Sequence, residues 1–133
     1  MPDTHQGFER AEEIVHAFND CEFARLLGIE IVEIWSGGAR AVMETPGKAN
    51  LMGIAHGGAV FALADHVFGV AANAGGAAQI AISAHIRYLA PATGRLEAVA
   101  RRVSETDRFS VFEVLVYAGD RLAASFEGVG LKI

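Results

Sequence analysis

The stretch 56–74 constrains the fold more than any other part of the sequence. It is rich in Ala, Leu, Val and Phe, contains no proline, and shows no clean polar stripe at helical spacing. A helix that is apolar on nearly all sides is a buried helix. Asp65 and His66 interrupt its apolar run, which argues against a membrane span. The rest of the chain must therefore supply surfaces that cover this helix.

Segments in which apolar and polar residues alternate, the pattern of β-strands, flank the predicted helix on both sides. Two precede it and four follow it, at 29–35, 39–45, 79–89, 94–104, 109–118 and 122–132. A Ser36-Gly37-Gly38 turn and short later connections favour antiparallel neighbours. We also expect an amphipathic helix over 8–18 and a loop over 45–55. In the segment 79–89, four apolar residues are expected to share one face: Ile80, Ile82, Ile86 and Tyr88.

These elements predict an α+β fold, in which one antiparallel sheet of about six strands wraps around one long central helix. At 133 residues the chain has room for one domain of ordinary size. We therefore expect a single domain over 1–133, with residues 1–20 forming an N-terminal helix and tail.

The composition is that of a globular protein, with 52% hydrophobic and 20% charged residues. The formal net charge of −5 gives no reason to expect nucleic acid as a partner, because that binding needs a basic face. Cys21 is the single cysteine, and residues 1–13 lack the apolar core of a secretory signal. We therefore expect a cytoplasmic protein that binds neither membrane nor nucleic acid.

Two glycines stand at the predicted start of the central helix, where each has low helix propensity. Gly57 and Gly58 follow His56 directly. The first N–H groups of a helix have no helical partner and lie at the positive end of its dipole, so they can bind a developing oxyanion. The structural alternative, a turn or tight packing, is equally compatible with the glycines alone.

Asp65 is a carboxylate inside an otherwise apolar helix. Burying such a group without a partner costs several kcal/mol in typical cases, so it is either paired or lines a wet cavity. Desolvation by the apolar residues around it should raise the pKa of this carboxyl. Gly57 and Asp65 lie eight residues apart, hence about 12 Å along the axis at about 1.5 Å per residue. If both act on one carbonyl, they must come from two subunits, which a two-fold interface provides twice.

The segment 50–65 resembles the PaaI-like branch of the hotdog-fold thioesterases. The motif residues are Asn50, Gly53, His56-Gly57-Gly58 and Leu63-Ala64-Asp65, followed by Phe68 and Asn73. The similarity continues through Tyr88-Leu-Ala-Pro91 and 94–98, and covers most of the chain from about Ile29 onward.

The resemblance implies hydrolysis of an acyl-CoA thioester with no metal or redox cofactor. Asp65 is then the general base or the nucleophile, and the backbone N–H of Gly57 is the oxyanion donor. Asn50 and His56 match positions that orient the water and the thioester carbonyl. Gly58 and Phe68 are expected to contact the substrate. We expect a homodimer at minimum, pairing further into a homotetramer.

Arginines are the expected partners of the CoA phosphates. Arg87, Arg101, Arg102 and Arg108 are candidates, and we select Arg108 because it lies at a turn before a strand. The five histidines show no zinc-ligand spacing with Cys21. Three alternatives stay open: a non-catalytic acyl-CoA-binding protein, an enoyl-CoA hydratase or dehydratase that uses His66 or His85, and a structural role in a larger assembly.

Overall fold

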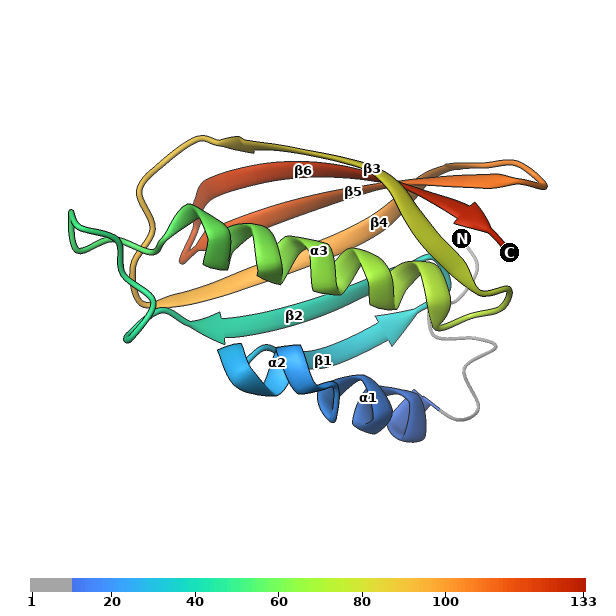
Figure 1. Ribbon diagram of the computed structural model, residues 1–133, viewed down its shortest axis with the longest axis horizontal. Coiled ribbons are helices and arrows are strands. Elements are labelled where there is room, and N and C mark those ends of the chain that lie inside the picture. The colour runs from blue at the N-terminus through green and yellow to red at the C-terminus, as the bar shows by residue number, and fades with distance from the viewer. Residues whose placement is uncertain (1–10) are drawn as a thin grey trace.

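The computed structural model describes residues 11–133 (Figure 1). Residues 8–10 of the helix predicted over 8–18 lie outside the described residues. The elements follow in the order α1 (Ala11–Asn19), α2 (Glu22–Leu27), β1 (Glu30–Trp35), β2 (Gly38–Glu44), α3 (Gly57–Asn73), β3 (Gln79–Tyr88), β4 (Arg95–Glu105), β5 (Phe109–Ala118) and β6 (Arg121–Lys132).

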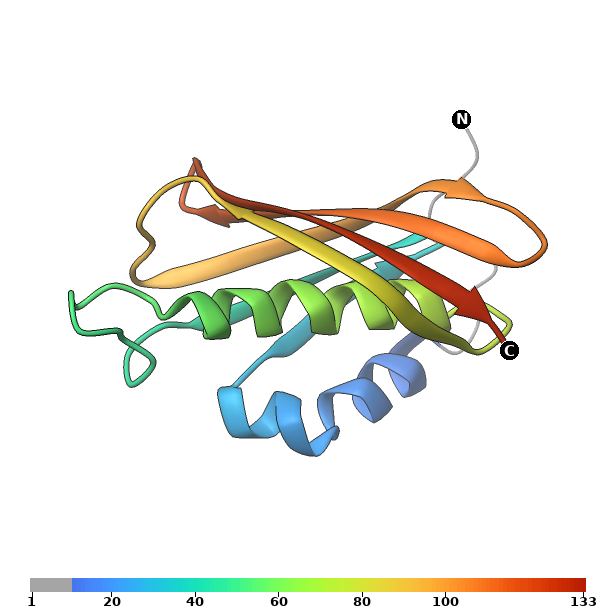
Figure 2. The same ribbon diagram turned by 45° about the horizontal axis from the view of Figure 1, so that its top comes forward.

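The six strands form one antiparallel sheet in the order β1-β2-β4-β5-β6-β3. The long helix α3 lies across one face of this sheet, and α1 and α2 lie beside β1 (Figures 1 and 2). The predicted α+β fold is therefore confirmed. Because β3 and β4 are not neighbours, the connection 89–94 crosses the ends of β6 and β5 to reach β4. This crossing brings it beside the start of α3, where the Ala55 N–H donates to the Ala92 carbonyl at 2.8 Å.

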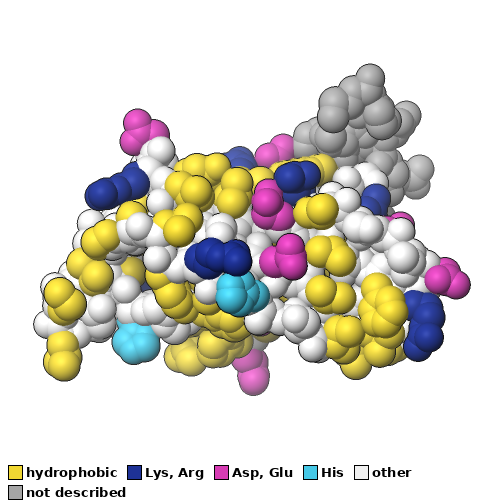
Figure 3. Space-filling view, turned by 90° about the horizontal axis from the view of Figure 1, so that it is seen from above, with side chains coloured by type: hydrophobic (Ala, Val, Ile, Leu, Met, Phe, Trp, Pro, Cys, Tyr) yellow, Lys and Arg dark blue, Asp and Glu magenta, His cyan; other side chains and the backbone are white. Residues whose placement is uncertain are grey.

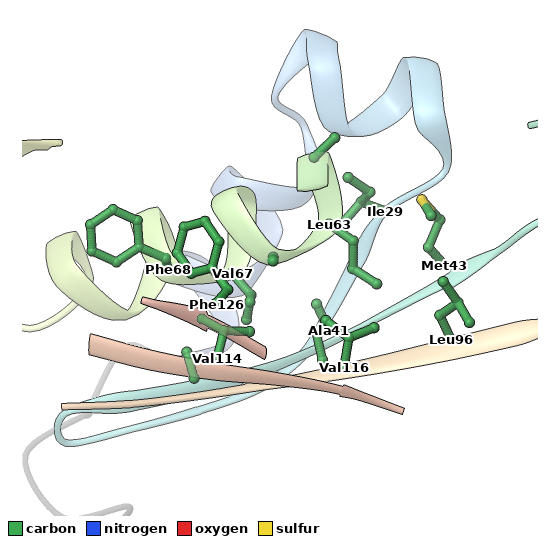
Figure 4. Close-up of a cluster of buried hydrophobic side chains, with 14 of the residues drawn as sticks. Ile29, Ala41, Met43, Leu63, Val67, Phe68, Leu96, Val114, Val116 and Phe126 are labelled. Carbon is green, nitrogen blue, oxygen red and sulfur yellow. The ribbon is translucent and has the colours of Figure 1, made fainter. Parts of the chain in front are cut away.

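The core lies between α3 and the sheet (Figure 4). Alternate residues of β5 are buried, and Phe112, Val114 and Val116 are at most 1% exposed. Rings from the helix and the sheet meet where Phe68 packs against Phe112 and Phe126, with centroids 5.8 and 5.7 Å apart. This packing explains the interior of α3, which the sequence predicted to be buried.

Strand β3 forms one edge of the sheet, and each of its residues is exposed or half-buried. A register shift between Ala81 and Ser83 interrupts the alternation of its side chains. The prediction that Ile80, Ile82, Ile86 and Tyr88 share one face is therefore wrong, because a bulge changes which side chains point to each face. A bulge of this kind is set by pairing with β6 and leaves no local signal in the sequence.

Helix α2 was not predicted. Its six residues are too few to show a helical period, yet Ala24 is fully buried and Gly28 ends the helix in a left-handed conformation with φ 69°. Asn19 joins the end of α1 to the sheet, because its side chain accepts from the Ile31 N–H at 2.6 Å and donates to the Ile31 carbonyl at 3.1 Å. Among residues 11–133, no helix combines the length and apolar composition needed to cross a membrane.

Candidate functional site

The start of α3 presents one backbone N–H that has no acceptor among the described residues 11–133. His56 caps the helix, and its Nδ1 accepts from the Gly58 N–H at 2.8 Å. The His56 carbonyl accepts from the N–H groups of Ala59 at 2.9 Å and Val60 at 3.2 Å. Within residues 11–133, the Gly57 N–H has no such partner. Of the two glycines, the geometry therefore selects Gly57 as the available donor.

This hydrogen bond also sets the tautomer of the neutral His56 ring. Because Nδ1 accepts a hydrogen bond, the proton of the neutral ring is on Nε2. The Nε2–H remains a donor on an exposed side chain. His56 is thus a helix cap first, and Gly58, whose N–H it holds, is not a free donor.

Tyr88 covers Gly57 from β3. Its hydroxyl donates to the Gly57 carbonyl at 3.0 Å, and its ring lies 3.3 Å from the point where a Cβ of residue 57 would stand. The peptide between Gly57 and Gly58 is therefore held on both sides, by Tyr88 at its carbonyl and by His56 at its N–H. Tyr88 belongs to a segment that resembles the family, but its role could not be predicted from the sequence because no local signal connects positions 57 and 88.

Asn50 lies in the loop before α3 and lines the same cavity as Gly57. The cavity has a volume of about 360 Å³, and its wall includes Asn50, Gly57, Val60, Tyr88, Pro91 and Ala92. The Asn50 Oδ1 accepts from the N–H groups of Met52 at 2.9 Å and Ile54 at 3.3 Å. Its Nδ2 makes no hydrogen bond within the described part of the chain, so the amide can donate to a ligand.

Asp65 lines a different and smaller cavity, of about 120 Å³, between α3 and β3. Burial raises the pKa of its carboxyl above the usual range. This direction was predicted from the apolar helix around it. Gly57 and Asp65 therefore face separate cavities of one chain, as their spacing along α3 requires.

Phe68 and His66 lie near Asp65 in the chain, and their surroundings differ from those of a catalytic group. Phe68 lines the same cavity but is only 2% exposed, so its ring belongs chiefly to the core. Burial lowers the pKa of His66, which keeps this ring neutral near pH 7. Its Nε2 is buried without a hydrogen-bond partner among the described residues.

Arg108 lies at the β4–β5 turn, with its guanidinium 5.6 Å from the centroid of the Phe109 ring. Gly57 packs beside the connection that leads into β4, so Arg108 lies at the other end of that strand. The structure does not bring Arg108 together with Gly57 in one chain. In the part of the chain that the structure describes, no group of three His, Cys, Asp or Glu side chains could hold a metal ion.

An antiparallel sheet around one long helix, with a carboxylate within that helix and glycines at its start, defines a hotdog-fold protein. The sequence matches the model of the thioesterase superfamily over residues 52–125, more than half of the chain. The protein therefore belongs to the thioesterase superfamily.

Solved structures agree with this assignment. The PaaI protein of the E. coli phenylacetic acid degradation operon is 28% identical, covers 92% of each chain, and has a TM-score of 0.86. A point mutant of the phenylacetic acid degradation protein PaaI from Thermus thermophilus is 31% identical over 85% of this chain and 100% of that chain, with a TM-score of 0.81. A thioesterase from Haemophilus influenzae is 18% identical over 98% of this chain and 95% of that chain, and its TM-score of 0.86 shows the shared fold. No curated protein matches the chain significantly.

Proposed function

We propose that the protein hydrolyses an acyl-CoA thioester to the free acid and CoA. This proposal rests on one observation: the same helix carries a Gly57 N–H that is free among the described residues and a half-buried Asp65 whose pKa is raised. These are the two groups that acyl transfer requires, an oxyanion donor and a base or nucleophile. Membership of the thioesterase superfamily supports the same reaction class.

In this proposal the reaction uses the Asp65 carboxylate, the Gly57 backbone N–H and water. As a general base, Asp65 removes a proton from the water that attacks the thioester carbon, while the Gly57 N–H stabilises the oxyanion. Collapse of the tetrahedral intermediate releases the CoA thiolate, which takes up the proton. As a nucleophile, Asp65 would instead attack the thioester carbon and displace the CoA thiolate, which forms an anhydride with the acyl group. Water then cleaves this anhydride to the free acid and the Asp65 carboxylate, and the proton it loses goes to the thiolate. Both routes use the same geometry.

A homodimer completes the proposed site. Strand β3 is an unprotected edge with exposed apolar side chains, among them Ile80 at 50%, Ile82 at 52% and Tyr88 at 55% exposure. Seen from the side on which β3 lies, hydrophobic side chains gather around a small group of charged residues (Figure 3). Such an edge pairs readily with another strand. An antiparallel copy across a two-fold axis would bring the Asp65 of one subunit toward the Gly57 of the other.

The remaining site residues have supporting roles in this proposal. The Nδ2 of Asn50 and the Nε2–H of His56 orient the water and the thioester carbonyl. Gly58 contacts the substrate, and Phe68, although mostly part of the core, contacts it where the ring lines the Asp65 cavity. Arg108 contacts a CoA phosphate, and in the dimer it would belong to the subunit that supplies Asp65. We further propose a cytoplasmic homotetramer that binds neither membrane nor nucleic acid.

The test is a panel of acyl-CoA thioesters, assayed by release of free thiol for the wild type and for Asp65→Asn. This substitution keeps the shape of the side chain and removes the base, so kcat should fall about a hundred- to ten-thousandfold. Undiminished turnover would refute the role of Asp65. Binding without thiol release by the wild type would identify a non-catalytic acyl-CoA-binding protein. Hydration of an enoyl-CoA would identify the hydratase alternative.

A further inference from the structure

The arginines of the described chain fall into two groups. One group contacts carboxylates and consists of Arg25, Arg40, Arg101 and Arg102. Within residues 11–133, the other group has no such partner and consists of Arg87, Arg95, Arg108 and Arg121, although the whole chain carries a net charge of −5. In this second group, Arg95 and Arg121 line one open cavity of about 620 Å³, a size within the range of about 300 to 1,000 Å³ typical of small-molecule sites.

The cavity is built from three strand ends. Arg95 begins β4, Arg121 begins β6, and Tyr117 lies next to the last residue of β5. Leu96 and Val116 are fully buried in the core, so their neighbours Arg95 and Tyr117 lie on the sheet face away from α3. The tertiary fold thus brings two guanidinium groups and a phenol ring to one wall.

This cavity shares one lining residue with the candidate active site. Pro91 lines both the Gly57 cavity and the cavity of Arg95 and Arg121. Pro91 belongs to the connection 89–94, which passes the ends of β6 and β5 to reach β4. A flexible ligand arm that leaves Gly57 and passes over Pro91 would therefore reach the two arginines.

We infer that this cavity binds the phosphorylated nucleoside end of the CoA substrate, and this inference rests on the proposed function. The planar guanidinium of arginine donates two parallel hydrogen bonds to a phosphate. An aromatic ring offers a face on which a purine base stacks. Arg95 and Arg121 bind the phosphates of this end that Arg108 does not contact, and Tyr117 supports the adenine.

The carboxylates near Arg95 and Arg121 form no ion pair with them among the described residues, so both guanidinium groups can bind a phosphate. Glu97, which also lines the cavity, contacts the Arg40 Nη1 at 3.2 Å, so its charge is already matched. Glu44 lies opposite Arg95 in the β2–β4 register, but no ion pair joins them among the described residues. Asp120 precedes Arg121 in the exposed β5–β6 turn.

The experiment compares two substrates with the same acyl group, a CoA thioester and a pantetheine thioester without the nucleotide. The variant is Arg95→Gln/Arg121→Gln. Its control is Arg25→Gln/Lys132→Gln, which removes the same charge from two side chains that contact carboxylates. For the CoA thioester, we expect the Arg95/Arg121 variant to lower kcat/KM at least tenfold, mainly through KM. Its kcat/KM for the pantetheine thioester and both values of the control should match the wild type.

Other results would overturn the inference and leave the proposed function standing. The first is an Arg95/Arg121 variant whose kcat/KM for the CoA thioester equals that of the wild type. The second is an equal loss of kcat/KM on both thioesters. The third is a loss of kcat/KM that is specific to the CoA thioester in Arg108→Gln but absent from the double variant.

A wild type that hydrolyses neither thioester would refute the proposed function, and the cavity is then tested by binding alone. Calorimetry with adenosine 3′,5′-bisphosphate should show at least tenfold weaker binding to the Arg95/Arg121 variant than to the wild type. Equal or undetectable binding would overturn the inference. Tyr117→Leu should weaken binding of this nucleotide and leave binding of pyrophosphate unchanged, and an equal effect on both ligands would exclude base stacking.

Discussion

The hydroxyl of Tyr88 donates a hydrogen bond of 3.0 Å to the carbonyl of Gly57. This contact joins the edge strand to the first residue of the central helix. Together with the His56 cap, it holds the peptide that follows the proposed oxyanion donor. A residue of the candidate dimer edge thereby also supports the candidate active site.

Tyr88→Phe removes this hydrogen bond and keeps the ring that packs on Gly57. A neutral hydrogen bond typically contributes about 0.5–1.5 kcal/mol, so we expect kcat to fall about two- to tenfold with little change in KM. Steady-state kinetics with an acyl-CoA thioester measures both constants. An unchanged kcat would show that the hydroxyl does not support the oxyanion donor.

Gly57→Ala places a Cβ 3.3 Å from the Tyr88 ring, so the ring or the start of α3 must shift. We expect a loss of kcat that approaches the roughly hundred- to thousandfold cost of removing an oxyanion donor. Gly69→Ala serves as the control for stability, because its Cβ meets no atom within 4 Å. That control should be more stable by about 0.5–1 kcal/mol in urea unfolding, since alanine favours a helix interior. Full activity of Gly57→Ala would contradict the role of Gly57.

The raised pKa of Asp65 predicts how activity depends on pH. Both mechanisms need the carboxylate, so kcat should rise with pH through a pKa above the ordinary Asp value of about 3.9. This limb should be absent from the residual activity of Asp65→Asn. A pH–rate profile of the wild type with no such limb would count against Asp65.

The same pKa has a consequence for stability. A carboxyl whose folded-state pKa is raised binds more protons folded than unfolded, so it destabilises the protein as pH rises between the two pKa values. Asp65→Asn should therefore be more stable than the wild type at neutral pH. The difference should shrink below the ordinary Asp pKa. Urea unfolding at both pH values measures it, and a less stable variant at neutral pH would reveal a structural partner of Asp65.

Mixing two inactive variants tests the shared site. A heterodimer of Asp65→Asn and Gly57→Val carries both defects in one site and none in the other, if each site uses two subunits. After unfolding and refolding together in equal amounts, half of the dimers should be mixed, and activity should return to about one quarter of the wild type. No recovery, in a mixture shown by mass spectrometry to contain heterodimers, would mean that each site lies within one chain.

Gly128→Ala tests the core beneath α3. A Cβ at this position would stand 2.8 Å from the Phe68 ring, closer than real Cβ contacts allow. Overpacking of this kind typically costs about 1–3 kcal/mol, which urea unfolding would measure. Gly119→Ala is unsuitable as a control because its φ of 64° strains any side chain. Gly76→Ala, with open space around it, should change stability much less.

Residue order alone was enough to predict the pattern of helices and strands and to single out the acid within the central helix. Period and alternation are local properties, so the buried helix and six strands could be read from residue order. The apolar surroundings of Asp65 in the same helix likewise predicted the direction of its pKa. The glycines at the start of α3 indicated an oxyanion site, but local reasoning could not choose between Gly57 and Gly58.

The remaining features became visible only in three dimensions, because they depend on side-chain geometry or on residues far apart in the chain. The His56 cap holds the Gly58 N–H and so selects Gly57 as the available donor, and the Tyr88 hydroxyl holds the Gly57 carbonyl. Pairing with β6 sets the bulge in β3 and leaves β3 at the edge. Arg95 and Arg121 meet because the sheet places the ends of β4, β5 and β6 together. Register and closure of a sheet are collective properties, so no single segment of sequence encodes them.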